Sequence, residues 1–443
     1  MTMMIGVVGV VAVTGLLLML TVRPAWVESV ALGLTVGLQV LVPAFGPSQL
    51  IRAGVVAVSV CYLILALLRR GRPVGRVNFP ILAMIFVGYL TFGNFIGARL
   101  PVVGYWALIG LMLILSAVLV ADGPARARSA VRVVLLISIP VELLVSVAEQ
   151  MRLIQTAWPR GDASDEITNR AHQFLGLIGR SEGTTGHPIL LGTLSAIGVV
   201  VALWSMLRAR RMLVRIGYLV LAAMAVGTAL LSGTRSALLT LGGCVLLWFL
   251  TARVIPWVIR ICVLGGVVAL GYRHLLDVAY SLLASVRDTT SFEHRFGVLG
   301  NVPRLLGRHG SEFWFGYGGG VDVGELFRSG AIAGHDQLAY FDDQWVRLLA
   351  VSGVIGVLLC LAMLLVGIWR TDQLGRLLIV MLVVMFFSFD LFTWTLPSLL
   401  LILAVAGPLG AQSDAAAPAD AESEPVTRRK RAVGIRRAWE YEL

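Results

Sequence analysis

Charged side chains, lysine and cysteine are all scarce in this chain. Among 443 residues, charged residues make up 14%, and Lys430 is the one lysine. A typical soluble domain carries about a quarter of its residues as charges, so the composition excludes a set of soluble domains. The four cysteines, Cys61, Cys244, Cys262 and Cys360, all stand inside apolar runs. Their spacing matches no zinc motif, and their surroundings argue against a disulfide framework.

Apolar residues are abundant instead. Hydrophobic residues make up 58% of the chain, and the mean hydropathy is +0.87. Many apolar runs approach about 20 residues, the length at which an α-helix crosses the roughly 30 Å hydrocarbon core of a membrane. The sequence therefore predicts an all-α polytopic membrane protein with about 12 or 13 transmembrane helices. The expected spans cover residues 3–22, 26–44, 51–69, 79–97, 102–121, 130–149, 187–207, 212–231, 236–253, 255–271, 344–368, 376–390 and 394–410, the last two forming one broken helix in the smaller count.

Two long polar connections divide these spans into groups. The expected order is transmembrane helices over 1–149, a loop over 150–186, helices over 187–271, a large loop over 272–343, helices over 344–410, and a disordered basic tail over 411–443. The tail is rich in alanine, proline and charge, a composition that cannot bury enough apolar surface to fold.

Arginine gathers in every second connection between the spans. Cytoplasmic loops of membrane proteins carry an excess of arginine and lysine, which accounts for the net charge of +11 without a nucleic-acid partner. The pattern predicts 13 spans with the N-terminus outside, so that both long loops and all six histidines lie on the outer face. The arginine-bearing connections are 69–76, 126–132, 208–211, 253, 370–376 and 428–431.

Arg235 stands in the turn Ser232-Gly233-Thr234-Arg235-Ser236, between two apolar runs. An arginine at that depth costs about 2.5–3.5 kcal/mol unless it reaches the interface or is paired. One interpretation is a guanidinium that faces the bundle and binds an anionic group such as a phosphate, which its planar fork suits. The other is an anchor at the membrane interface.

Three further stretches of the outer loops carry polar groups. Arg304 and Arg308 would lie one turn apart on a helix, which favours an amphipathic helix resting on headgroups. The stretch from Arg180 leads to His187-Pro188, which fits a helix start because proline is tolerated in the first turn. The cluster Gly316–Gly320 matches no nucleotide-binding motif and is interpreted as a flexible turn.

Asp342 and Asp343 open the span that follows the large loop. Paired carboxylates at a helix start can satisfy free backbone amides and the helix dipole. Either carboxylate could also act as a general base toward a hydroxyl nucleophile. No histidine falls at ligand spacing with them, so a metal site is not expected.

Together these segments resemble the O-antigen ligase and O-antigen polymerase superfamily of membrane glycan-assembly enzymes. The resemblance covers roughly residues 180–360, in the family's order. Its most specific part is the serine-glycine-threonine-arginine element. The segments that carry it are Arg180, Gly183, His187-Pro188 and Gly192; Ser232–Leu239; Phe315–Gly318 in a large outer loop; and Asp342–Trp345 followed by Gly353–Gly356.

The resemblance implies a metal-independent transferase of the GT-C type in the inner (cytoplasmic) membrane, without a cofactor. Such an enzyme moves a saccharide from undecaprenyl or decaprenyl diphosphate to a hydroxyl of a glycan or lipid acceptor, on the outer face. The implied partners are this donor, the acceptor and membrane lipids, with no nucleic acid. Whether the reaction is a single transfer or a polymerisation stays open.

The resemblance also implies roles for individual residues. Arg235 and Arg295 would bind the diphosphate, whose developing charge such groups stabilise. Lipopolysaccharide ligases carry a histidine where this chain has Asp342, which favours the polymerase branch or a divergent one. Asp342 would then act as base, with His335 as a second candidate. The expected substrate-binding residues are Arg180, His187, His335, Asp343 and Arg304.

Two other classes of function compete with this interpretation. A transporter or flippase for a polysaccharide precursor would place charges or broken helices near the membrane midplane. The spans are nearly free of buried charge by sequence, and Asp390 alone resembles such a feature. A non-catalytic scaffold of envelope assembly would tolerate the loss of Arg235.

Overall fold

The structure is a computed structural model. It describes residues 2–42, 49–71, 81–95, 100–154, 156–158, 179–251, 256–262, 265–266, 297–319, 323–328, 330, 332 and 343–410. The helices below belong to the unit Met1–Ala411, and the predicted tail over 411–443 lies outside the described residues. Residues 255, 263–264 and 267–271 of the expected span over 255–271 also lie outside them.

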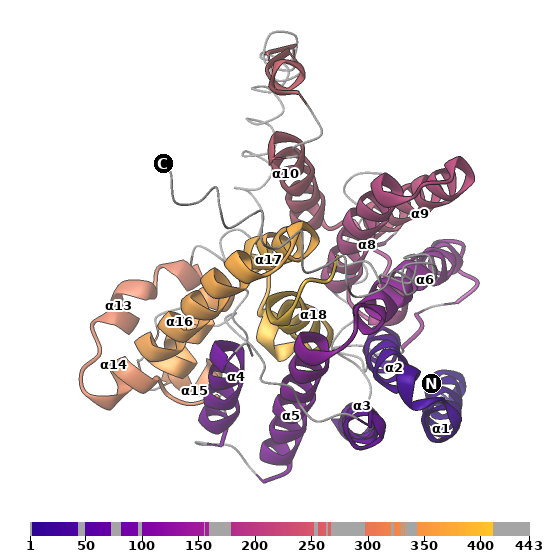
Figure 1. The fold of residues 1–443 in the computed structure, drawn as a ribbon. Coiled ribbons are helices and arrows are strands. Elements are labelled where there is room, and N and C mark those ends of the chain that lie inside the picture. The colour runs from indigo at the N-terminus through magenta and orange to yellow at the C-terminus, as the bar shows by residue number, and fades with distance from the viewer. Residues whose placement is uncertain are drawn as a thin grey trace, which may run out of the picture. The chain divides into compact units, whose positions relative to one another are not determined.

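The regular elements of the described residues are helices (Figure 1). They are α1 (Thr2–Thr21), η1 (Pro24–Trp26), α2 (Val27–Leu41), α3 (Gln49–Arg69), α4 (Ile81–Gly93), α5 (Leu100–Asp122), α6 (Ala125–Gln150), η3 (Gly183–Thr185), α8 (Pro188–Arg208), α9 (Met212–Ser232), α10 (Arg235–Thr251), α13 (Val302–Leu306), α14 (Ser311–Phe315), α15 (Val323–Arg328), α16 (Gln344–Arg370), α17 (Gln373–Met385), η4 (Leu391–Thr393) and α18 (Thr395–Ala406).

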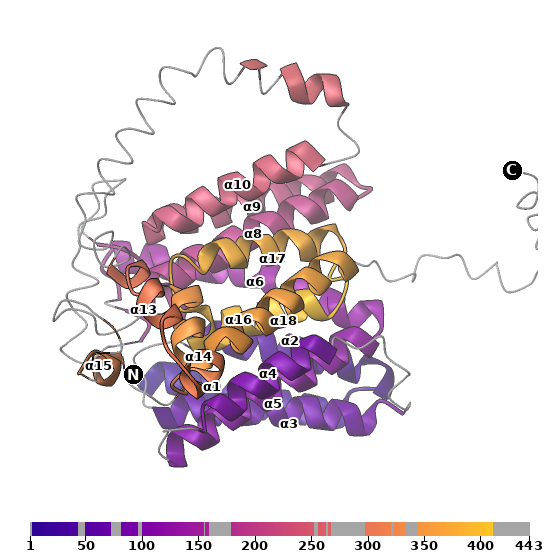
Figure 2. The same cartoon turned by 90° about the vertical axis from the view of Figure 1, so that its left-hand side faces the viewer.

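The helices confirm a polytopic membrane protein at the level of its architecture. Seven helices of the described residues are long and apolar enough to cross a membrane, and five shorter apolar helices accompany them. Each lies on one of the predicted spans, and the long ones run side by side (Figure 2). Apolar runs of this length form helices because every backbone polar group must be satisfied within the segment in lipid.

Helix α18 lies in the midst of the others and is the most enclosed (Figure 1). Its side chains from Leu396 to Ala406 are all buried. It packs against α5, α17, α16 and α2, while α8 contributes a second heavily buried surface against α9 and α10. Both helices are therefore apolar all round, as expected for a helix without a solvent or lipid face.

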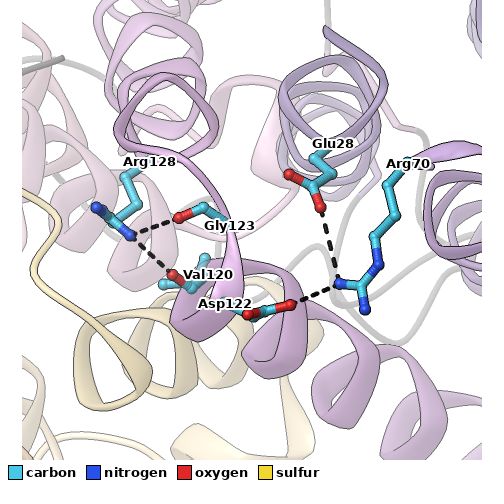
Figure 3. Close-up of polar contacts among 6 residues, drawn as sticks. All are labelled: Glu28, Arg70, Val120, Asp122, Gly123 and Arg128. Atoms are coloured by element: carbon cyan, nitrogen blue, oxygen red, sulfur yellow. Dashed lines mark hydrogen bonds and ion pairs between the residues drawn. The ribbon is translucent and has the colours of Figure 1, made fainter. Parts of the chain in front are cut away.

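Charged groups are buried within this bundle, so the expectation of spans nearly free of buried charge was wrong. Glu142 in α6 is 1% exposed. At the other end of the bundle, Arg70 donates a 2.8 Å hydrogen bond to Asp122 and lies 3.8 Å from Glu28 (Figure 3). Hydropathy averages conceal such groups, because a single charge barely changes the mean of a 20-residue window.

Part of the large loop packs onto the start of α16. Val298, Leu305, Leu326 and Ile332 form a small apolar core with the first turns of that helix. This core is separate from the main one between the long helices. It fixes the described loop segments at the end of the bundle where α16 begins.

Candidate functional site

The loop before α8 is held by two carboxylates of α6. Glu142 Oε2 accepts a 2.9 Å hydrogen bond from the Thr184 N–H, and its other oxygen accepts from the Thr184 hydroxyl. Glu149 Oε2 accepts from the backbone N–H groups of Glu182 (2.9 Å) and Gly183 (3.1 Å). Sequence reasoning missed both groups, although two glutamates in the last turns of an apolar run were a visible signal.

Arg180 joins this loop to the turn between α9 and α10. Its Nε donates to the Ser232 carbonyl and its Nη2 to the Thr234 hydroxyl, each at 2.9 Å. Thr234 in turn donates to the Pro188 carbonyl at 2.8 Å. Gly233 closes α9 with φ +59°, a left-handed conformation that favours glycine. The first two segments of the resemblance are thus brought together, and Arg180 supports the turn.

Arg235 follows this turn directly as the first residue of α10 and is half-buried. The turn that Arg180 holds fixes the start of α10, and with it the position of the Arg235 backbone. The structure therefore places Arg235 at the end of the bundle where α8 and α16 also begin. The anchor and the anion-binding interpretations of this guanidinium both stay predictions.

His187 caps α8, which confirms the predicted helix start. Its Nδ1 accepts from the Ile189 N–H at 3.2 Å, and Pro188 occupies the first helical position. The imidazole also packs on Trp394, with ring centroids 4.9 Å apart, and Trp394 stacks on Phe389 at 4.5 Å. The cap and the ring contact tie α8 to the start of α18.

Asp343 caps α16 in the same way. Its Oδ1 accepts from the Val346 N–H at 3.0 Å, and the residue is 2% exposed. This confirms the capping interpretation of the carboxylate pair for Asp343. Asp342, Arg295 and His335, which were also expected at the site, lie outside the described residues.

The glycine-rich segment docks on a break in α16, so the prediction of a flexible turn was wrong. Gly353 has φ +62° and interrupts the helix. The N–H groups of Tyr317 and Gly318 donate to the freed carbonyls of Ala350 and Val351, both at 2.9 Å. Tyr89 donates its hydroxyl to the Ser352 carbonyl at 2.7 Å. The third and fourth segments of the resemblance therefore meet at this break.

Arg308 completes the same contact. Its guanidinium donates to the carbonyls of Leu349 (2.6 Å) and Ala350 (3.2 Å) and lies 5.0 Å from the Tyr317 ring centroid. Burial lowers the pKa of Arg308. The predicted helix that places Arg304 and Arg308 on one face was wrong, because α13 ends at Leu306 and leaves Arg304 exposed.

A cleft lies between α4, α5, α16 and α18 at the same end of the bundle. It contains about 640 Å³ of space outside protein atoms, counting its open part, and its walls are mostly apolar. The polar groups that line it are Arg347, Gln344, Asn94, Thr91, Ser352 and Ser398. Apolar clefts with a few convergent polar groups are the usual form of ligand sites.

Arg347 is the cation of this cleft, and sequence reasoning missed it. It forms an ion pair with Asp390, whose side chain is 8% exposed, against 24% for Arg347. Gln344 makes two hydrogen bonds to the segment around Asp390. Its N–H donates to the Phe386 carbonyl (2.8 Å), and its Oε1 accepts from the Phe392 N–H (2.7 Å). Arg347 lies one turn inside α16. Because the residues around it are mostly apolar, the sequence indicated an ordinary membrane span there.

The site therefore combines the guanidinium groups of Arg235 and Arg347, the cleft between α4, α5, α16 and α18, and two segments held by hydrogen bonds. These are the turn before α10 and the glycine-rich segment at the break in α16. Arginine in such a place binds phosphate and carboxylate groups through its planar fork. Among the described residues, no three histidine, cysteine, aspartate or glutamate side chains gather as a metal site would require.

Comparisons with known proteins complete the description of the site. The chain matches no protein-family model, and no curated protein matches its sequence.

Proposed function

We propose that this chain is a membrane glycosyltransferase of the GT-C type that resembles O-antigen ligases and polymerases. It transfers or polymerises a saccharide carried on a polyprenyl diphosphate, using an acceptor at the outer face of the inner membrane. One observation carries the proposal. The segments on which the resemblance rests are far apart in sequence, yet their described parts meet at one end of an apolar bundle, beside a cleft that holds an arginine.

The chemistry needs an acceptor oxygen, a base and a stabilised leaving group. The acceptor hydroxyl attacks the anomeric carbon, the bond from that carbon to the phosphate oxygen breaks, and the diphosphate leaves with the electron pair. Asp342 takes the hydroxyl proton, as a positioned carboxylate can. Arg235 and Arg295 neutralise the charge that develops on the diphosphate, with Arg347 placed to assist from the cleft.

Transport of a polysaccharide precursor is the second candidate, because α16 is discontinuous at Gly353. Discontinuous membrane helices form substrate sites in many transporters, since their unwound carbonyls can bind ligands. In this chain the carbonyls freed at Gly353 are bound by Tyr317, Gly318, Arg308 and Tyr89. The break is thus occupied by the chain itself, which supports the transferase over the transporter.

Glycan profiling tests the proposal. A deletion strain is complemented with wild type, Arg235→Ala, Asp342→Ala or the control Arg376→Ala, whose exposed side chain lies at the opposite end of the bundle. We expect loss of surface polymer by about 100-fold or more in the first two variants, since removing one such stabilising group costs about that factor in rate. Expression is matched by immunoblot.

The pattern of products separates the alternatives. A ladder reduced to one repeat indicates a polymerase, and full-length chains left on the lipid carrier indicate a ligase. Full complementation by Arg235→Ala would overturn the transferase and favour transport or scaffolding.

Cysteine labelling tests the predicted orientation. Ser311→Cys places a thiol on the exposed first residue of α14, and Arg210→Cys places one at the other end of the bundle. With 13 spans and the N-terminus outside, an impermeant maleimide should label residue 311 in cells with an opened outer envelope and residue 210 only after lysis. The reverse pattern would contradict both the orientation and the location of the site.

A further inference from the structure

Several large apolar side chains are exposed on the loop segments that pack onto α16. Leu299 precedes α13, Leu306 ends it, and Trp314 and Phe315 end α14. Their exposed fractions lie between 40% for Leu299 and 54% for Phe315. We call these four residues the loop patch. A short segment that exposes this much apolar surface indicates contact with something other than water.

The contact between α14 and α16 fixes the depth of this patch. The carbonyl group of Trp314 packs directly against Gly353, where α16 breaks. At the other end of α16, Trp369 and Arg370 are both exposed, and these residue types are typical of a membrane surface. About 25 Å of helix separate Gly353 from Arg370, at a rise of ~1.5 Å per residue. Since the hydrocarbon core is about 30 Å thick, Trp314 lies at or just inside the opposite membrane surface.

The patch also lies on a side of the bundle that faces lipid. Figure 1 shows α13 and α14 outside α16, away from the central helix α18. Along α16, Leu358, Leu365 and Trp369 are exposed at the spacing of one helix face. One turn before Leu358, the same face reaches Val354, which packs against the small core of the loop. The loop thus takes the place of lipid on this face near one membrane surface, so its own exposed side chains lie next to lipid.

The end of α4 adds two more exposed rings to this surface. The glycine-rich segment that follows Phe315 binds that end, since the N–H of Gly319 donates to the carbonyl of Gly93 at 3.0 Å. Phe92 and Phe95 flank Gly93 and are 67% and 45% exposed. Tryptophan, phenylalanine and leucine are the side chains with which amphipathic segments enter the membrane interface. The composition of this surface therefore fits the boundary between headgroups and acyl chains.

We infer that the loop patch inserts into the lipid leaflet at this end of the bundle and holds the loop on the membrane surface. The partner is the lipid bilayer itself, because the patch lies at the depth of the interface and continues the lipid-facing side of α16. With the predicted orientation, the leaflet is the outer one. This surface is separate from the transferase site, and the inference does not depend on the proposed function.

Spin labels measure the depth of the patch in the purified full-length protein. Leu306→Cys or Phe315→Cys carries the label, after Cys61→Ala and Cys262→Ala have removed the exposed thiols. Each variant is reconstituted into phospholipid nanodiscs that hold one copy of the protein, so that a second copy cannot cover the patch. Collisions of the label with oxygen, which dissolves in lipid, and with a water-soluble nickel chelate then give its depth.

We expect the labels at positions 306 and 315 to lie about 5–10 Å below the lipid phosphates, the depth to which amphipathic segments bury their apolar face. Two controls bracket this result. Arg210→Cys places a label at an exposed polar position between α8 and α9, where collisions with the chelate should dominate. Leu365→Cys places one on the exposed face of α16 within the hydrocarbon core, where collisions with oxygen should dominate.

Two results would overturn the inference. Labels at 306 and 315 that meet the chelate as freely as the label at 210 would show that the patch stands in water. Labels shielded from both reagents would show that another part of the chain covers it. Because all four labelled positions are exposed, the variants should unfold at the temperature of the unlabelled protein, which verifies that the fold is intact.

Liposomes at high protein density separate the lipid from a second copy of the chain. The spectrum of the label at 315 should stay the same when labelled protein is diluted with unlabelled protein, because each patch contacts lipid. Narrower lines on dilution would show that two labels had been close together. In that case the patch is an interface between copies, and the lipid assignment is wrong.

Discussion

Replacing Gly353 by alanine is expected to destabilise the protein by about 3 kcal/mol or more. Gly353 adopts φ +62° and ψ −166°, a region of backbone conformation that glycine alone occupies readily. A Cβ there would lie 2.4 Å from both the carbonyl carbon and oxygen of Trp314. Since these are backbone atoms, no side-chain rotation can relieve the contact.

The same argument applies to Gly316 on the opposing segment. It has φ +73° and ψ −166°, and its Cβ would lie 2.4 Å from the carbonyl atoms of Val351. The two glycines face each other, and a Cβ on either one would lie 2.6 Å from the backbone nitrogen of the other. Alanine at either position should therefore separate the loop from α16.

Thermal unfolding in detergent measures the effect. Gly88→Ala in α4 is the matched control, because nothing lies within 4 Å of a Cβ there and alanine favours a helix. We expect an apparent unfolding temperature far below wild type for Gly353→Ala and no decrease for Gly88→Ala. Equal unfolding temperatures for the two variants would contradict the docked arrangement.

Breaking the ion pair between Arg347 and Asp390 is expected to have the second large effect. Removing one partner of a buried pair leaves an uncompensated charge and typically costs about 3–5 kcal/mol. Arg347→Gln should show most of this cost because it removes the cation beside the Asp390 carboxylate, which is 8% exposed, while Asp390→Asn should show less because the remaining Arg347 guanidinium is 24% exposed. The double variant should recover part of the loss, since both charges of the pair are then removed.

A double-mutant cycle measures the coupling. The unfolding free energies of wild type, both single variants and the double variant are compared, and we expect a coupling of about 1–3 kcal/mol, as for residues in direct contact. Arg370→Gln, at an exposed position on the same helix, should change stability by less than about 0.5 kcal/mol. A coupling near zero would mean that the pair does not form in the folded protein.

Features with local causes could be predicted from the sequence. The apolar runs located the long helices, because hydrocarbon thickness fixes their length. Pro188 and Asp343 marked helix starts by the chemistry of free amide groups, and Gly233 lies in the turn that was expected before Arg235. Each of these signals is contained in a few neighbouring residues.

Features that depend on distant partners could not be predicted. Gly316 reads as part of a flexible turn until Gly353 is known to lie against it. Glu142 and Arg347 look like isolated charges in apolar runs until Thr184 and Asp390 are placed beside them. A pattern of residue types along the chain holds no information on which of many polar groups will be neighbours in space.

The break in α16 also bears on how the protein is assembled. The loop segment that binds its freed carbonyls precedes α16 in the chain, so it leaves the ribosome before the helix does. During insertion, the carbonyls of Ala350 and Val351 would be exposed to lipid without a donor unless that segment is already bound to them, because lipid offers no donors. The loop thus acts as a built-in folding aid for the helix that follows it. A chimera that exchanges the loop without its matching glycine on α16 should therefore fail at biogenesis, before any question of activity arises.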